Sequence, residues 1–108
     1  MPVQVDRADF ARPDAPWLVV VFTSATCQTC AKVVSTAAVL TSAEVVVEEV
    51  EYGARGDVQR RYGIEAVPTV VIADAAGVVR TSIQGPVNAS DLWAAMATVR
   101  AAPDAPEV

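Results

Sequence analysis

The sequence predicts one α/β domain built around a mixed β-sheet. Short apolar segments rich in β-branched residues alternate with segments of helical spacing, which is typical of strands joined by helices. A further pair of strand-like segments around a turn indicates a hairpin. The chain has 108 residues and 53% are hydrophobic, so it can bury a core without a disulfide or a metal. We expect one domain over residues 1–101 and a flexible tail over residues 102–108.

The first half of the chain is expected to hold three strands and one helix. Val3–Val5 is a predicted short edge strand, and Ala11–Pro16 a predicted loop, because each of its two prolines also restricts the residue before it. Trp17–Phe22 reads WLVVVF, an apolar run typical of a strand buried on both faces, as in a parallel sheet. Apolar residues at helical spacing predict a helix from about Cys27 to Leu40, and Glu44–Glu51 is the next predicted strand.

The second half is expected to complete the sheet and add two helices. In chain order, its predicted elements are a flexible loop Gly53–Gly56, a short helix Asp57–Tyr62, hairpin strands Thr69–Ala73 and Val78–Ile83, and a last helix. Asn88, Ser90 or Asp91 is expected to cap that last helix, which ends near Val99.

The charge of the chain disfavours two classes of partner. The net charge is −5, the pI is about 4.5, and the longest basic cluster is Arg60-Arg61. Binding to nucleic acid or to an anionic membrane is therefore disfavoured.

The N-terminus has no basic region followed by an apolar stretch, and no apolar run is long enough to span a bilayer. We therefore expect a cytoplasmic monomer without a signal peptide.

The only two cysteines, Cys27 and Cys30, form a C-x-x-C pair shortly after the buried strand. If the helix begins at Cys27, its thiol faces unpaired backbone N–H groups and the positive end of the helix dipole, which both favour a thiolate. Cys30 would lie on the same helical face and could close a disulfide with it. This arrangement predicts a redox pair in which exposed Cys27 attacks and the more buried Cys30 resolves the mixed disulfide.

Two other interpretations of the cysteine pair stay open. A zinc site needs four ligands, and a chain with no histidine and no third cysteine would need a dimer or carboxylate ligands to supply them. A C-x-x-C alone is only moderately specific, so two unreactive thiols or a structural disulfide form the second alternative. A reducing compartment disfavours the structural disulfide. We expect no metal.

Two longer segments resemble the thioredoxin family. VVVFTSATCQTC is similar to the thioredoxin active-site segment, in which a buried strand ends in Phe and a C-x-x-C follows shortly after. YGIEAVPTVVIADAAG, residues 62–77, resembles the second signature of the family, whose central proline is cis in thioredoxins and is here Pro68. Gly77 and Gly85 match the two glycines that follow. The resemblance covers Leu18–Val99.

This resemblance implies a thioredoxin fold, with a central mixed sheet flanked by helices and a shortened first helix. It implies a thiol–disulfide oxidoreductase that acts on protein disulfides, is supplied with electrons by an upstream protein reductase, and uses no cofactor beyond the redox-active disulfide Cys27–Cys30. Thr26, Gln28 and Thr29 around the cysteines are expected to contact substrate.

The Val67-Pro68 step is expected to bind the substrate backbone. A proline has no N–H for a central ladder, and a cis bond before proline costs little compared with other cis peptides. In the family this turn packs against the cysteines, and the backbone of the preceding residue, here Val67, pairs with an extended substrate strand. A trans proline at a strand edge is the alternative.

The sequence also departs from the family pattern. Thr26 stands where thioredoxins usually have Trp, and Gln28-Thr29 where they usually have Gly-Pro. The helix expected between the first two strands is cut to Ala11–Pro16 or little more. These departures weaken the expectation of a broad disulfide reductase served by a standard thioredoxin reductase. A binding module or redox sensor with one dedicated partner is therefore kept as an alternative.

The proton acceptor for the second cysteine is also different. Thioredoxins usually place an aspartate near the end of the buried strand, and the matching residue here is Val21. Counting back from Pro68 puts Glu49 at the position of a lysine that often pairs with that aspartate. We hypothesise that Glu49 supplies the missing carboxylate, and that it is desolvated with a raised pKa, as a base for a thiol requires. The alternative is that Glu49 simply faces water.

Overall fold

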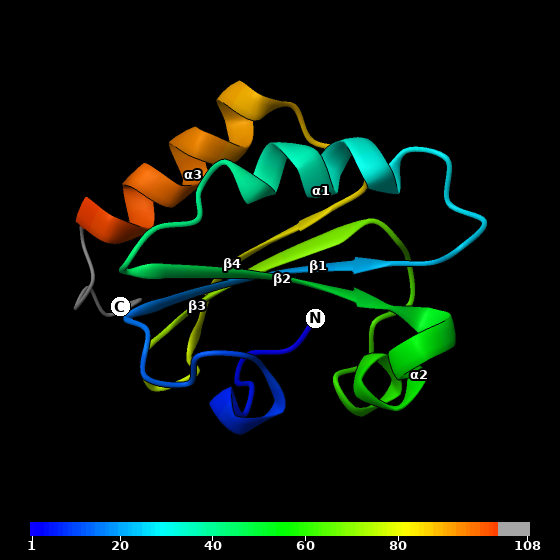
Figure 1. Ribbon diagram of the computed structural model, residues 1–108, viewed down its shortest axis with the longest axis horizontal. Helices are drawn as coiled ribbons and strands as arrows, with labels where there is room; N and C mark the ends of the chain where they lie inside the picture. Colours follow the sequence, from blue (N-terminus) through cyan, green and yellow to red (C-terminus); the bar gives the residue numbers. More distant parts are fainter. Residues whose placement is uncertain (102–108) are drawn as a thin grey trace.

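Four strands form one mixed sheet at the centre of the molecule (Figure 1). The computed structural model describes residues 1–101. The strands are β1 (Trp17–Thr23), β2 (Val45–Glu51), β3 (Thr69–Asp74) and β4 (Val79–Gln84), in the spatial order β2-β1-β3-β4. β1 runs parallel to β2 and antiparallel to β3, and β3 and β4 form the antiparallel hairpin. The α/β architecture with a mixed sheet is confirmed.

Helices cover both faces of this sheet (Figure 1). The helical elements are a 3₁₀ turn Arg7–Asp9, α1 (Cys30–Ala38), α2 (Tyr52–Arg61) and α3 (Ala89–Ala101). α1 and α3 pack on one face, whose core includes Val19, Val21 and Val70. α2 and the N-terminal segment pack on the other face, where Phe22 and Val50 lie. Within residues 1–101, no helix has the length and apolar character needed to cross a bilayer.

β1 is buried along its whole length. It is paired with β2 on one side and β3 on the other, helices cover both of its faces, and it contains no charged residue. Trp17 is its most exposed residue at 7%, and Leu18 to Phe22 are completely buried. Burial on this scale stabilises by about 25 cal/mol per Å² of apolar surface removed from water, so the apolar run itself selects the central position. Burial on both faces, predicted from WLVVVF, is therefore confirmed.

Two helices begin at residues other than those predicted. α1 begins at Cys30 instead of Cys27, because turns lie on both sides of Cys27. In the first of them the Cys27 N–H donates to the Ser24 carbonyl at 3.2 Å. α2 includes the predicted loop Gly53–Gly56, because the Glu51 carboxylate accepts from the Ala54 N–H at 2.9 Å and caps an earlier start. A kink at Arg55 (φ −139°, ψ 47°) lies inside α2.

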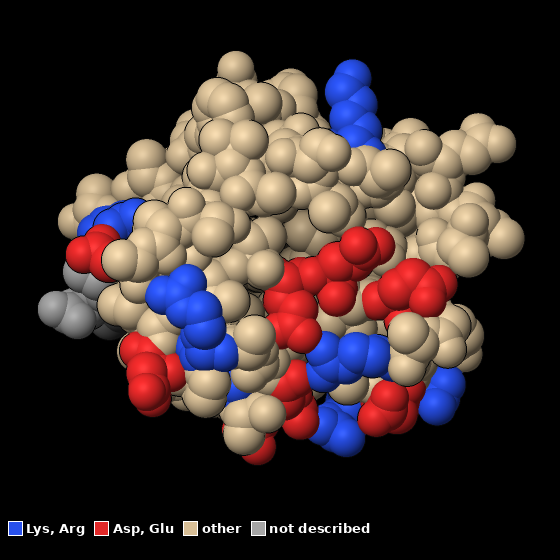
Figure 2. Space-filling model, in the orientation of Figure 1, with Lys and Arg blue, Asp and Glu red and all other residues tan. Residues whose placement is uncertain are grey.

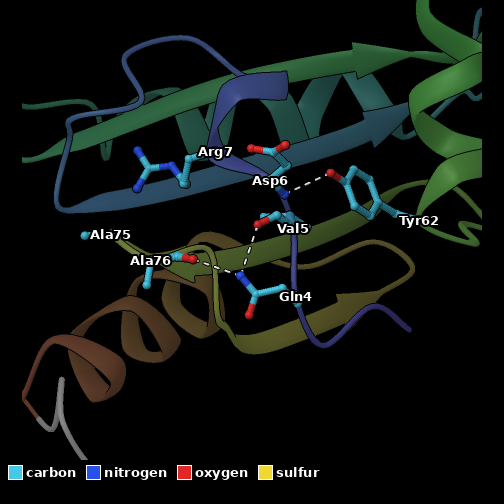
Figure 3. A pocket seen from close by; sticks show the side chains of 7 residues that line it. All are labelled: Gln4, Val5, Asp6, Arg7, Tyr62, Ala75 and Ala76. Atoms are coloured by element: carbon cyan, nitrogen blue, oxygen red, sulfur yellow. Dashed lines mark hydrogen bonds between the residues drawn. The ribbon is translucent and has the colours of Figure 1, made fainter.

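The N-terminal segment does not form the predicted edge strand. It makes one antiparallel bridge, between Gln4 and Val78 at the turn of the hairpin. Figure 3 shows how this segment is held: the Gln4 amide donates to the Ala76 carbonyl at 2.8 Å, and the Asp6 N–H donates to the Tyr62 hydroxyl at 2.9 Å. Single polar contacts to two different loops replace a continuous ladder.

The remaining elements agree with the prediction to within about two residues. The first helix is shortened, as predicted, but its remnant is the three-residue 3₁₀ turn Arg7–Asp9, which lies before the predicted Ala11–Pro16. Of the three candidate caps of the last helix, Asn88 takes the role, because its Oδ1 accepts from the Asp91 N–H at 2.7 Å. The tail expected over residues 102–108 lies outside the described residues.

Candidate active site

Cys27 and Cys30 are joined in a disulfide between the end of β1 and the start of α1. Their Cα atoms are 5.5 Å apart. Cys27 is partly exposed in the loop after β1, whereas Cys30 is 3% exposed at the first position of α1. The expectation that both cysteines share a helical face is wrong. The bond instead crosses the turn before α1 and places both sulfurs at the N-terminal end of that helix.

The residues around the disulfide lie open to solvent. Thr26, Gln28 and Thr29, which we expected to contact substrate, are all exposed. The Thr29 hydroxyl is 3.8 Å from the Cys27 sulfur. A partner can therefore approach Cys27 from solvent, whereas Cys30 is almost fully shielded from it.

The Val67–Pro68 peptide bond is cis. Pro68 is buried and immediately precedes β3, whose first residue, Thr69, is the register partner of Phe22 on β1. The loop before β3 and the cysteine loop after β1 therefore lie at the same end of the sheet (Figure 1). Among residues 1–101, the backbone of Val67 makes no hydrogen bond.

Two hollows adjoin at Ser24. The smaller, of about 200 Å³, lies between the loop before β3 and α2, and is lined by Ser24, Tyr52, Gln59, Ile64, Glu65, Ala66 and Val67. The larger, of about 450 Å³, lies beside the disulfide and is lined by Ser24, Ala25, Cys27, Cys30, Ala31, Val34, Glu49 and Glu51. Figure 2 shows acidic side chains gathered on this face below α1, over β2 and the start of α2. The disulfide thus borders an acidic hollow.

Glu49 lies where the count from Pro68 predicted, on β2 directly beside Val21 of β1. It lies on the α1 side of the sheet, because side chains alternate along a strand and Val45 and Val47 pack on that side. Its carboxylate accepts a hydrogen bond from the Thr23 hydroxyl at 2.8 Å. The expected desolvation is wrong: Glu49 is an exposed residue that borders the hollow.

The two neighbouring acids have other partners. Glu51 also borders the hollow, but its carboxylate caps α2. Glu48 lies on the opposite face of β2 and pairs with Arg55 at 2.5 Å. Of the three glutamates near the end of β2, Glu49 is the one that borders the hollow beside the disulfide and, among residues 1–101, pairs with no cation and caps no helix.

Three residues that the sequence did not point to shape this site: Thr23, Ser24 and Gln59. Thr23 binds Glu49, and Ser24 separates the two hollows. Buried Gln59 donates from its amide to the Thr23 carbonyl at 2.8 Å and to the Val50 carbonyl at 2.9 Å, which ties the ends of β1 and β2 to α2. A buried polar residue in a short polar helix, such as Gln59, carries no periodic signal that would single it out.

The zinc alternative is not supported by a ligand set in the described part of the chain. Within residues 1–101, no three side chains among His, Cys, Asp and Glu are grouped so that they could hold a metal ion.

A family model for a thioredoxin-like domain matches residues 3–100, which include the disulfide, Glu49 and Pro68. The chain belongs to the thioredoxin-like family. Its fold and its close cysteine pair support a role of the thiol–disulfide oxidoreductase kind. A search of curated proteins found no match.

Solved structures resemble this thioredoxin-like protein in fold. Thioredoxin O2 from Arabidopsis thaliana, in the oxidised state, is 24% identical, with a TM-score of 0.70 over 87% of this chain and 89% of its own. Deadhead, a germline-specific thioredoxin from Drosophila melanogaster, is 23% identical, with a TM-score of 0.70 over 81% of this chain and 84% of its own. A malarial protein is 16% identical, with a TM-score of 0.70 over 77% of this chain and 96% of its own. At these identities the likeness concerns the fold.

Proposed function

We propose that this thioredoxin-like protein reduces or exchanges protein disulfides through Cys27 and Cys30. The observation that carries the proposal is the unequal exposure of the bonded pair: Cys27 is partly exposed, and Cys30 is 3% exposed at the start of α1. A helix N-terminus stabilises the negative charge of a thiolate. The pair can therefore supply one accessible nucleophile and one shielded resolving thiol.

The first step uses reduced Cys27. Its thiolate attacks one sulfur of a substrate disulfide, breaks that bond, and forms a mixed disulfide while the other substrate sulfur leaves as a thiolate. In the second step the thiol of Cys30 gives up its proton, and its thiolate attacks the sulfur of Cys27. The substrate leaves as its second thiolate, which takes up a proton, and the Cys27–Cys30 disulfide forms. Two electrons have passed to the substrate.

We assign the proton transfer in the second step to Glu49. It is the carboxylate that borders the same hollow as Cys30 without serving a cation or a helix end. Although Glu49 is exposed and is not desolvated as the sequence predicted, it borders the same hollow as Cys30, and a carboxylate oxygen can accept a proton there. The carboxylate would hold the proton of Cys30 as the new disulfide forms and return it to solvent afterwards.

Substrate docking is proposed for the loop residues on either side of the disulfide. The free backbone of Val67 would pair with an extended segment of the substrate, as in β-augmentation. Exposed Thr26, Gln28 and Thr29 would contact the substrate around Cys27. We propose that an upstream protein reductase returns the protein to the dithiol form, without another cofactor, and that the protein works in the cytoplasm as a monomer.

Turnover of a model protein disulfide tests this function. With dithiothreitol as the electron source, the protein is expected to accelerate the reduction of insulin disulfides, which is followed as precipitation of the freed chains. C27S and C30S are the matched variants, and both are expected to lose turnover because each removes one thiol of the pair. Precipitation by the unaltered protein at the rate of dithiothreitol alone would contradict the proposal and favour the dedicated-partner alternative.

A further inference from the structure

Thr23 joins the end of β1 to the acidic hollow. It is the last residue of β1, is 1% exposed, and lies in register with Glu51 of β2. Its backbone carbonyl accepts the buried Gln59 amide at 2.8 Å. Its hydroxyl donates to Glu49 Oε2 at 2.8 Å. Both ends of Thr23 are therefore fixed, the backbone by Gln59 and the side chain by Glu49.

The hydroxyl of Thr23 restrains a side chain that is otherwise free to move. Among residues 1–101, it is the one group that hydrogen-bonds or ion-pairs with the Glu49 carboxylate. An exposed glutamate samples many rotamers, and fixing it in one costs side-chain entropy. Thr is β-branched with few χ1 rotamers, and a buried Thr held by its backbone is a rigid donor. The bond occupies Oε2 and leaves Oε1 able to accept.

We propose that Thr23 is a positioning residue for the resolving step. Its hydroxyl holds the Glu49 carboxylate beside the hollow shared with Cys30, so that the open carboxylate oxygen accepts the proton of the Cys30 thiol. This inference rests on the proposed function, because it concerns the step in which Cys30 displaces the substrate. The proton moves from Cys30 to Glu49, and the thiolate forms the bond to Cys27 as the substrate thiolate leaves.

The alternative is that Thr23 only supports the fold. In that case its hydroxyl contributes to stability, and its removal lowers the free energy of unfolding without a specific effect on the resolving step. A hydrogen bond to a charged group of this kind contributes to stability in many proteins, so stability alone does not separate the two roles. The readout must be the rate of the second chemical step.

Stopped-flow reaction with 5,5′-dithiobis(2-nitrobenzoate) isolates that step. The reduced protein releases one thionitrobenzoate when Cys27 attacks and a second when Cys30 resolves the mixed disulfide. If the mixed disulfide is first formed at acidic pH and then jumped to neutral pH, the second release is seen alone. T23V is expected to slow it roughly tenfold, the rate equivalent of losing a hydrogen bond to a charged group. T23S keeps the hydroxyl and is expected to restore most of the rate.

A double-mutant cycle with Glu49 separates positioning from general support of the fold. E49Q is expected to slow the second release. In the T23V/E49Q double variant, T23V is expected to cause no further slowing. E51Q removes one negative charge from the same hollow, and its rate is expected to stay within about twofold of the unaltered protein, because the Glu51 side chain accepts from the Ala54 N–H at the start of α2 and makes no hydrogen bond to Thr23. If T23V does not fold, T23A takes its place in the cycle.

Three results would overturn the inference. They are an unchanged rate in E49Q, effects of T23V and E49Q that simply add, or T23S as slow as T23V. A failure of the proposed function looks different, because the unaltered protein would then release one thionitrobenzoate and retain the other in a stable mixed disulfide.

Discussion

At the scale of single residues, the carboxylate near the cysteines is on β2, whereas thioredoxins usually have it on the buried strand that matches β1. The family usually places an aspartate near the end of the buried strand, and here that position holds Val21, which is completely buried. Glu49 lies beside it on β2 and is exposed. An apolar side chain inside and a carboxylate at the solvent edge avoid the cost of burying a charge, which is several kcal/mol even after relaxation. The proton acceptor, on this account, works from the rim of the site.

A second carboxylate, Asp9, holds the N-terminal segment against α2. Its Oδ2 accepts from the Tyr62 hydroxyl at 2.5 Å and lies 2.7 Å from the Arg61 guanidinium. The hydrogen bond from Tyr62, with that from Arg61, holds the pKa of Asp9 below its usual value. Burial raises the pKa of Tyr62, so its phenol stays protonated and continues to donate.

Replacing Asp9 by Asn is therefore expected to lower the free energy of unfolding by about 1–2 kcal/mol at neutral pH. The native pKa of Asp9 is depressed, so its stabilisation is present above the unfolded value of about 3.9 and is lost as the pH falls through the native pKa. The difference between D9N and the unaltered protein should shrink from pH 7 towards about pH 3 in urea unfolding.

Asp57 provides the matched control for this experiment. It also pairs with Arg61, but at 3.9 Å, and its side chain is 67% exposed. D57N is expected to change stability by less than about 0.5 kcal/mol at either pH. If D9N lowered the free energy of unfolding by the same amount at pH 7 and at about pH 3, the assigned role of the Asp9 charge would be contradicted.

At the scale of elements, the hairpin turn at Gly77 holds the N-terminal segment. Gly77 has φ +85°, and its carbonyl accepts from the Val5 N–H at 2.8 Å. A Cβ built at Gly77 would lie 2.1 Å from the Val5 carbonyl oxygen, which is backbone and has little room to move. Gly63 has a similar φ, +67°, but a Cβ there meets nothing within 4 Å.

The two glycines therefore predict different costs for the same substitution. G63A carries only the backbone cost of a left-handed conformation, about 1–2 kcal/mol. G77A carries that cost plus the clash with Val5, and is expected to lose at least about 1 kcal/mol more, as overpacked substitutions do. Urea unfolding measures both. Equal losses in G77A and G63A would show that the N-terminal segment is not held at this turn.

The four strands of the sheet could be predicted from the sequence more accurately than the helix starts, whereas the predicted edge strand Val3–Val5 makes only an isolated bridge. Trp17–Phe22 and Thr69–Ala73 are apolar runs that can be buried only inside the sheet, and each agrees with the observed strand to within about one residue. Helix starts depend on single polar contacts instead. Gly53 and Gly56 have poor helix propensity, and only the Glu51 carboxylate at the helix start shows why α2 begins before them.

The same distinction applies to the candidate site. The cysteine spacing can be read directly from the sequence. The resemblance to thioredoxins, by the count back from Pro68, predicted that Glu49 lies on the strand beside Val21, and the register of β1 and β2 places it there. The partner of Glu49 could not be found in this way. A threonine at the end of an apolar strand is ordinary in sequence, and its hydroxyl gains a role only when β1 and β2 are aligned.

At the scale of the whole molecule, the fold gathers one end of the sheet into a site. The cysteine loop, the loop before β3 and the end of β2 come from distant parts of the sequence and meet at that end (Figure 1). Acidic side chains lie below α1 on the face with β2 (Figure 2). A partner whose disulfide is flanked by basic residues should therefore associate faster, with a rate that falls as salt is added.

The proposed function requires that a disulfide moves from a substrate protein to Cys27 and Cys30. In a single turnover, the reduced protein is mixed with an equal amount of a disulfide-bonded protein, quenched with acid, and analysed by intact mass spectrometry. The unaltered protein is expected to become the Cys27–Cys30 disulfide as the substrate gains two thiols, and C30S to stop as a covalent one-to-one complex through Cys27. A reduced protein that keeps both thiols, with C30S forming no complex, would contradict the account.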